Sequence, residues 1–382
     1  MKVKFCTFIM PQSKAHSMEA TQVDFALHFL KRHRDSLIIS PLSISTALAM
    51  AYAGSDGLTK EEMKRVLAGD NTDADLHSFF TPVLNNMGEN SDETVIEMAN
   101  KIYVQEGVNI LQQYASFIEK QYGGNLQVID FTNSVKAAET VNAWVAQTTH
   151  DCVKNLIDPS VINSLTRMIL INAAYFKGTW KTMFNAGRTN EEVFYVAEGV
   201  EKQVRMMYNK GRYGYTKSEN VQVVCLPYSS DKLVMYIVLP EERFEIHDFV
   251  SRIDGNRMLT LMDNCHITDV EVRIPKFKID TTLELSKHLK EAGIKEAFND
   301  NADFSKITEN QTLLISDVIH KAFVEIDESG TKAAAATGVV MRTRRATPMT
   351  PQEFEIFHAN HGFLYFIVNT KSKGIMFAGS FC

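Results

Sequence analysis

The spacing of apolar side chains predicts helices in the first part of the chain and strands in the later part. Between residues 18 and 31, Val23, Ala26, Leu27 and Leu30 recur at the three- and four-residue intervals of an amphipathic helix. Apolar runs and alternations predict strands at 167–176, 221–226, 233–239, 269–279, 313–326, 363–369 and 375–380. Helices that come early and strands that come late indicate an α+β fold rather than a βαβ repeat.

Capping residues predict the boundaries of three further helices. Ser40 is expected to be an N-cap, with Pro41 in the first turn of the helix that follows. Ser134 is expected to cap another helix in the same way. The Thr-Thr-Leu-Glu sequence at 281–284 fits a capping box for a helix that ends near Gly293.

The segment from residue 328 to 345 has a pattern that suits two environments. With period two, one face of it carries no charge: Thr331, Ala333, Ala335, Thr337, Val339, Met341 and Thr343. That alternation is typical of a strand with one buried face, whereas the four alanines at 333–336 favour a helix over a strand. The arginine-rich end would attract proteases in an exposed loop. The segment therefore fits either an accessible loop or a strand inside a sheet.

These residues closely resemble the reactive loop of the serpins, a family of protease inhibitors. The resemblance covers residues 18–382 in family order and rests on the sequences at 40–44, 170–180, 226–228, 236–240, 274–277, 320–322 and 357–363. It implies a single serpin domain with three β-sheets, about nine helices and an exposed reactive-centre loop at about residues 328–356. Residues 1–17 would be an N-terminal extension, either disordered or a weak leader.

The resemblance also implies a hinge of the kind found in serpins that inhibit. Its members are Glu328, Gly330, Thr331, Ala333, Ala334, Ala335 and Ala336. Gly330 would supply backbone freedom where the chain bends. Thr331 would be the first side chain beneath the sheet surface, where a charge would carry a large desolvation penalty. Small alanine side chains could then pass between existing strands.

The reactive bond is expected in the arginine-rich end of the loop. The family's usual spacing from the hinge glycine gives Arg344–Arg345 as the scissile bond, with Arg342 and Thr343 as adjoining recognition residues. An arginine there would pair bidentately with an aspartate in a trypsin-like specificity pocket. The same residues also fit Arg-x-Arg-Arg, the recognition pattern of furin-like convertases, with cleavage after Arg345. Because the loop is longer than usual beyond Arg345, Met349 remains another candidate.

Six further residues are assigned by the resemblance to the region that must open. Ser40, Ser43, Asn172 and His320, the shutter residues, would form a small polar network beneath the central sheet. Trp180 and Lys276, the breach residues, would lie at the top of that sheet, where Lys276 would pair with Glu328.

No sequence motif indicates an enzyme. The chain lacks Gly-x-Ser-x-Gly, His-Glu-x-x-His, a P-loop and Gly-x-Gly-x-x-Gly. His358 and His361 are three residues apart, but in an extended segment they point to opposite faces, so a metal site is not expected. No cofactor or metal is predicted. A buried, hydrogen-bonded role is expected for His320.

Composition and cysteine usage bear on the compartment and the partners. A formal net charge of −6 gives no reason to expect nucleic acid or an anionic membrane as a partner. The five cysteines, Cys6, Cys152, Cys225, Cys265 and Cys382, are odd in number and scattered, and are interpreted as free thiols. An intracellular, cytoplasmic location is therefore favoured. Secretion is the alternative, because residues 1–10 could be a short leader.

The sequence thus predicts a monomeric serine protease inhibitor that acts as a suicide substrate. Its partner would be a trypsin-like, Arg-specific protease, held as a covalent acyl-enzyme after the loop is cleaved and inserted. Three alternatives stay open: inhibition of a furin-like convertase, inhibition of a papain-like cysteine protease, and a serpin without inhibitory activity. The physiological protease and the rate of inhibition do not follow from the sequence.

Overall fold

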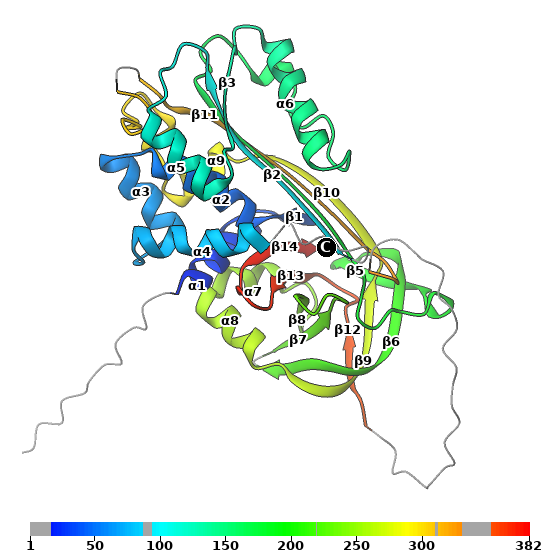
Figure 1. Ribbon diagram of the computed structural model, residues 1–382. Helices are drawn as coiled ribbons and strands as arrows, with labels where there is room; N and C mark the ends of the chain where they lie inside the picture. Colours follow the sequence, from blue (N-terminus) through cyan, green and yellow to red (C-terminus); the bar gives the residue numbers. More distant parts are fainter. Residues whose placement is uncertain (1–16, 87–93, 219, 310–311, 331–352) are drawn as a thin grey trace, which may run out of the picture.

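The computed structural model describes residues 17–86, 94–218, 220–309, 312–330 and 353–382 (Figure 1). Within these residues the helices are α1 (Met18–Leu30), α2 (Pro41–Ala53), α3 (Gly57–Leu67), α4 (Asp73–Asn86), α5 (Gln112–Tyr122), α6 (Ser134–Thr148), α7 (Ile246–Arg252), α8 (Gly255–Asp263) and α9 (Ser286–Ala292). Three short 3-10 helices lie at Pro159–Val161, Ala186–Arg188 and Glu296–Phe298.

The strands follow the helix-rich first part of the chain, as the apolar pattern predicts. They are β1 (Leu37–Ile39), β2 (Thr94–Gln105), β3 (Leu126–Ile129), β4 (Met168–Gly178), β5 (Asn190–Ala197), β6 (Val200–Ser218), β7 (Val221–Pro227), β8 (Leu233–Pro240), β9 (His266–Pro275), β10 (Phe277–Glu284), β11 (Ile315–Ile326), β12 (Glu355–His358), β13 (Phe363–Asn369) and β14 (Ile375–Phe381). Each predicted strand segment contains an observed strand. The segment at 269–279 contains two, which are separated at Lys276.

Of the three predicted helix caps, the structure confirms one and shows that two are wrong. Ser40 is the N-cap of α2, and its side chain accepts a hydrogen bond from the Ser43 amide. The N-cap of α6, however, is Asn133, with Ser134 already in the helix. Residues 281–284 lie in β10, where antiparallel pairing with β11 uses their backbone groups, so they cannot form a capping box. The predicted end at Gly293 is confirmed, because Gly293 is the left-handed C-cap of α9.

The strands form two hydrogen-bonded networks. One has five strands in the order β10-β11-β4-β2-β3. The other has nine, in the order β1-β14-β13-β8-β7-β6-β9-β12, with β5 also paired to β6. The long strand β6 pairs with β9 over Met206–Tyr215 and with β7 over Gly214–Ser218. The nine-stranded network therefore consists of two parts that share β6, which is how three expected sheets become two connected networks.

The core occupies both faces of the five-stranded sheet. On one face, α2 packs between this sheet and β14, and nearly all of its side chains are buried. On the other face, Ala138, Val141 and Val145 of α6 pack on Ile169 and Ile171 of β4. Figure 1 shows α6 running along this outer side of the sheet. Because β4 is covered on both faces, its sequence is a continuous apolar run rather than an alternation.

Candidate functional site

The candidate site lies along the parallel ladder formed by β4 and β11, two long central strands of the five-stranded sheet. β11 pairs in parallel with β4 from Ile315↔Met168 to Val324↔Phe176. β2 pairs antiparallel with β4 on one side, and β10 pairs antiparallel with β11 on the other. The chain leaves β11 at Ile326 and enters a turn at residues 327–330. The turn therefore leads directly from this ladder into the segment that the sequence identifies as the hinge.

Asp327 organises that turn. Its Oδ1 accepts hydrogen bonds from the Ser329 amide, the Ser329 hydroxyl and the Gly330 amide, each at 3.0 Å. This is the local side-chain-to-backbone bonding that aspartate provides in turns. It closes the chain on itself directly after the last residue of β11.

Gly330 is required by both backbone conformation and space. Its φ is +109°, a region that side chains rarely adopt. A Cβ at this position would lie 2.2 Å from the Gly178 carbonyl oxygen and 2.6 Å from the Trp180 amide nitrogen. The end of β4 and the residues after it therefore pack directly against the hinge backbone. The sequence predicts a conformational role for this glycine but not the close approach.

Trp180 joins the turn to the body of the protein. Its indole Nε1 donates to the Asp327 carbonyl at 2.9 Å, and its amide donates to the Ser329 carbonyl at 2.8 Å. The ring is 2% exposed and stacks on Tyr228 with a centroid separation of 4.4 Å. Trp180 thus fixes two carbonyls of the turn while filling the apolar space below it.

Glu328 is held by charge and hydrogen bonds on the opposite side of the turn. Lys276 Nζ donates to its Oε2 at 2.8 Å, and Thr189 Oγ1 donates to its Oε1 at 2.9 Å. Burial alone would raise the pKa of Glu328, but the bonds from Lys276 and Thr189 outweigh it and lower the pKa below its ordinary value. The carboxylate is therefore ionised at neutral pH. Lys276 and Glu328, which the resemblance pairs, are in direct contact.

The shutter residues lie on one row across the sheet. Asn100 of β2, Asn172 of β4 and His320 of β11 are successive Cα partners in the two ladders. They meet the N-terminus of α2, where Asn172 Nδ2 donates to Ser43 Oγ at 2.6 Å and the Ser40 amide donates to His320 Nε2 at 3.2 Å. The structure brings together all four shutter residues that the sequence names.

This network crosses the β4–β11 ladder itself. Because His320 Nε2 accepts from the Ser40 amide, Nδ1 carries the proton and donates to Asn172 Oδ1. Burial lowers the pKa of His320 to about 3, so the ring is neutral at physiological pH. Ser40 Oγ donates to the Met376 carbonyl at 2.7 Å, which ties α2 to β14. A neutral, buried set of hydrogen bonds therefore spans the two strands.

Three contributing residues were missed by the sequence analysis. Asn100 accepts from Ser43 Oγ at 2.7 Å and is also bonded by Asn172, but β2 was not predicted, so nothing marked it. Asp327 and Thr189 hold the hinge turn and Glu328. An aspartate three residues before a glycine is a general turn signal and could have identified Asp327. Thr189 carries no comparable signal.

The remaining predicted residues fall outside the described part of the chain. They are Thr331, Ala333, Ala334, Ala335, Ala336, Arg342, Thr343, Arg344, Arg345 and Met349. His358 and His361 are among the described residues, and they contact different groups. His358 Nε2 contacts Glu192 Oε2 at 3.0 Å, while His361 Nε2 contacts the Pro240 carbonyl at 2.8 Å. Among the described residues, no group of three or more potential ligands could hold a metal ion.

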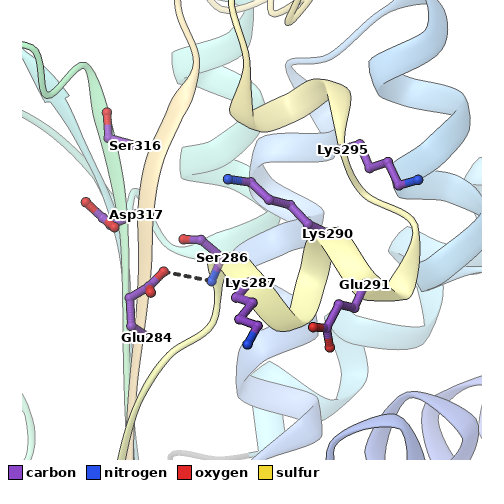
Figure 2. Close-up of a pocket in the computed structure, with 8 residues that line it drawn as sticks. All are labelled: Glu284, Ser286, Lys287, Lys290, Glu291, Lys295, Ser316 and Asp317. Carbon is purple, nitrogen blue, oxygen red and sulfur yellow. Dashed lines mark hydrogen bonds between the residues drawn. The ribbon is translucent and has the colours of Figure 1, made fainter.

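A surface pocket at the opposite end of β11 has mixed charge. Figure 2 shows it between α9 and the strands β10 and β11, with Glu284 and Asp317 on the strand side and Lys287 and Lys290 on the helix. Burial and then the charge of Glu284 raise the pKa of Asp317 to about 6. Acidic and basic groups both line the opening, so the pocket favours no single class of charged ligand. No helix of the described residues is long and apolar enough to span a bilayer.

Comparisons with known proteins agree with a fold in which the central parallel ladder ends at the turn of residues 327–330. A family model described as "Serpin (serine protease inhibitor)" matches residues 20–382, and the chain belongs to this family. It is thus a protein of a protease-inhibitor family rather than an enzyme. The serpin resemblance and the α+β serpin fold are confirmed.

Individual relatives support this over nearly the whole chain. "Intracellular coagulation inhibitor 2" of Tachypleus tridentatus is 34% identical over 377 residues, which cover 96% of this chain and 91% of that protein. "Serpin B6" of Pongo abelii is 32% identical, with coverage of 94% and 96%. The crystal structure of Serpin48, described as a highly specific serpin in the insect Tenebrio molitor, superposes with a TM-score of 0.82 at 30% identity, covering 95% of this chain and 96% of that one.

Proposed function

We propose that this protein is a suicide-substrate inhibitor of trypsin-like serine proteases, with Arg344–Arg345 as the reactive bond. Residues 18–382 would act as one inhibitory domain, with the loop at about 328–356 and residues 1–17 as an extension. Arg342 and Thr343 would contribute to recognition by the protease. The arginine side chain on the N-terminal side of the bond suits the aspartate of a trypsin-like pocket.

The observation that carries the proposal is the direction of the strands on either side of the ladder that would open. β4 and β11 are parallel, and directly after β11 the chain enters a turn at residues 327–330, in which the Gly330 amide donates to the Asp327 carbonyl at 3.1 Å. A segment that folds back from this turn would run antiparallel to both β11 and β4. Antiparallel pairing is slightly more stable per residue than parallel pairing. Inserting the loop would therefore replace one parallel ladder with two antiparallel ladders.

The free energy available from such an insertion is large. Roughly a dozen new ladder hydrogen bonds at about 1 kcal/mol net each give on the order of 10 kcal/mol. That is comparable to the stability of a typical domain. Serpin loop insertion is itself a standard example of strand addition and of the release of stored strain. The uncleaved form would be held in place kinetically rather than by equilibrium.

The hinge composition fits this movement. Gly330 adopts a φ of +109°, which a change of direction at this point requires. Beyond it, Thr331 and the alanines 333–336 would enter between two strands that are already covered on both faces, so large or charged side chains would be excluded. The protease would first form an ordinary acyl-enzyme with the loop. Moving that ester by about 1 Å from the oxyanion hole would stall its hydrolysis.

An intracellular location is part of the proposal. It is supported by the scattered cysteines and by a relative named as an intracellular coagulation inhibitor. The partner would be the target protease, bound covalently by a monomeric inhibitor. Nucleic acid and membrane partners are not proposed, because the net charge of −6 favours neither.

Incubation of the full chain with trypsin, a furin-like convertase and a papain-like protease tests the proposal. Trypsin is expected to give a covalent complex that survives SDS. Mass spectrometry should show that the released C-terminal peptide begins at Arg345. Thr331→Arg is the matched variant: it should be cleaved at the same bond without a stable complex. A released peptide that begins at Ala346, together with a complex formed by the convertase, would instead assign Arg345–Ala346 as the reactive bond and a furin-like convertase as the target. Clean cleavage of the unmodified chain by every protease would contradict inhibition.

A further inference from the structure

A second chemically active place lies away from the hinge, the breach residues and the shutter residues. Cys225 is in the middle of β7, and Cys265 follows the last turn of α8 immediately before β9. Both residues are partly exposed. The two residues are far apart in the sequence, and neither takes part in the proposed inhibitory mechanism.

Gly214 creates the space in which these two side chains meet. It is in β6, where its Cα partners are Cys225 of β7 and Ile267 of β9. A Cβ at this position would lie 2.9 Å from Cys225 Sγ, 3.0 Å from Cys225 Cβ and 3.5 Å from Cys265 Cβ. The Cys225 side chain therefore occupies the volume that a Cβ would fill at this point of the strand, and the Cys265 side chain borders that volume.

The two cysteine side chains lie close together. Cys265 Sγ is 4.0 Å from the carbonyl oxygen of Val223, which is two residues before Cys225 in β7. The neighbouring Cys265 and burial raise the pKa of the Cys225 thiol. Cys265 Sγ also lies 3.7 Å from the Leu261 carbonyl at the end of α8. The Cys265 side chain thus lies between α8 and β7. Two cysteine side chains that lie side by side can be joined by a disulfide after rotation of the side chains.

We propose that Cys225 and Cys265 form a reversible disulfide, so that this part of the nine-stranded sheet is a redox-sensitive site. The oxidant would be a small-molecule disulfide such as oxidised glutathione. Cys265 attacks one sulfur of that molecule, giving a mixed disulfide and releasing one reduced glutathione, which takes the proton. Cys225 then attacks the Cys265 sulfur, and the second reduced glutathione leaves with the second proton. Two protein thiols are oxidised by two electrons, and one glutathione disulfide is reduced.

The order of attack follows from the surroundings of the sulfurs. The neighbouring Cys265 and burial raise the pKa of the Cys225 thiol and disfavour its thiolate, so the first attack is assigned to Cys265. Once formed, the bond links β7 to the start of β9 and closes a loop that contains β8, α7 and α8. A covalent link across such a loop restricts the unfolded chain. Oxidation should therefore raise the resistance of this region to unfolding.

The test uses the full-length protein, purified with a reductant and then equilibrated in buffers of graded reduced-to-oxidised glutathione ratio. Alkylation and mass spectrometry should show two thiols lost together, and digestion should give a peptide from β7 linked to one from the α8–β9 junction. Cys152, which is exposed, should take up a single glutathione and serves as the internal control, because this mass increase differs from the loss of two hydrogens expected for the linked pair. Cys225→Ser and Cys265→Ser should each abolish the linked peptide.

Two glycines of the same strand make the test specific. Gly214→Ala puts a methyl group against both cysteines and should require a glutathione ratio about tenfold more oxidising for half-formation. Gly211→Ala first meets a ring carbon of Tyr213 at 3.4 Å, an ordinary contact, and should leave the midpoint unchanged. Mixed disulfides with glutathione that persist separately on Cys225 and on Cys265 would overturn the proposal. So would equal midpoints for the two glycine variants.

Discussion

The middle of the ladder between β4 and β11, where the shutter residues lie, and the region beyond its C-terminal end are stabilised in different ways. The shutter residues are completely buried, and their hydrogen bonds involve neutral groups. Beyond the C-terminal end of β11, the Lys276 side chain is 40% exposed, and the Glu328 carboxylate with which it pairs is charged. The shutter therefore depends on exact pairing in a dry environment, whereas the breach region combines a surface ion pair with a tightly fitted turn.

The comparison indicates which kind of interaction controls each part. A buried polar group that loses its partner suffers the full desolvation cost, so the shutter has no low-cost alternative arrangement. The ion pair of Lys276 with Glu328 should contribute less, because water can solvate the lysine side chain, which is 40% exposed against 14% for the glutamate. At the top of the sheet, the close packing around Gly330 and Trp180 should matter more than the charges.

Substitution of Gly330 should have the largest effect on stability. Gly330→Ala combines an unfavourable φ with a contact of 2.2 Å to the Gly178 carbonyl, and should cost about 3 kcal/mol or more. Gly199 also has a positive φ, but a Cβ there meets nothing within 4 Å. Gly199→Ala should therefore cost only about 1 kcal/mol. Urea denaturation of both variants measures the difference. Equal losses would mean that packing at the hinge contributes nothing.

The shutter is tested by two serines of α2. Ser43→Ala removes a donor to Asn100 and an acceptor for Asn172, and should destabilise the protein by about 1–3 kcal/mol. Ser45 is buried as well, but its Oγ has no hydrogen-bond partner among the described residues. Ser45→Ala should be neutral or stabilising in the same urea measurement. A loss at Ser45 as large as that at Ser43 would contradict the importance of the network.

Acidification should weaken the shutter before the breach region. Because the pKa of His320 is lowered to about 3, the unfolded chain binds a proton from about pH 6.5 downward and the folded chain does not. This residue alone should remove about 1.4 kcal/mol of stability per pH unit as the pH falls from about 6 toward 3. Asp317 acts in the opposite direction below about pH 6, since its folded pKa is raised.

A comparison of variants isolates the histidine. The pH dependence of urea unfolding gives the number of protons taken up on unfolding. Between pH 6 and 5, His320→Gln should reduce that number by about one. Glu328→Gln should leave the slope in that window unchanged, because the pKa of Glu328 is lowered and its ionisation is complete there. A variant at position 320 with the slope of the unmodified protein would rule out His320 as the titrating group.

The ion pair of the breach region should have the smallest effect. A double-mutant cycle with Glu328→Gln and Lys276→Met isolates the interaction between them. With the lysine 40% exposed, the coupling should be about 1 kcal/mol or less, and should decrease further in high salt. A coupling larger than the loss at Ser43 would reverse the order of the comparison.

The elements that could be predicted have strong local patterns. The continuous apolar run of β4 and the Ser40-Pro41 start of α2 identify themselves. β2 was missed because charged residues such as Glu97 and Lys101 interrupt its pattern, and Asn100 was missed with it. The cap of α6 was placed one residue late, because Asn133 and Ser134 are equally suitable by type. Only the backbone conformation distinguishes them.

The amino-acid order by itself determined the covered faces of the strands, the need for glycine at position 330 and the small side chains that follow it. These properties depend on neighbouring residues and on local backbone freedom. The hydrogen bonds of Asn100 with Asn172 and of Thr189 with Glu328, and the approach of Cys225 to Cys265, were decided only by the tertiary structure. Each pair joins distant parts of the chain, and such parts meet only when the order and direction of the strands are set by packing of the whole sheet.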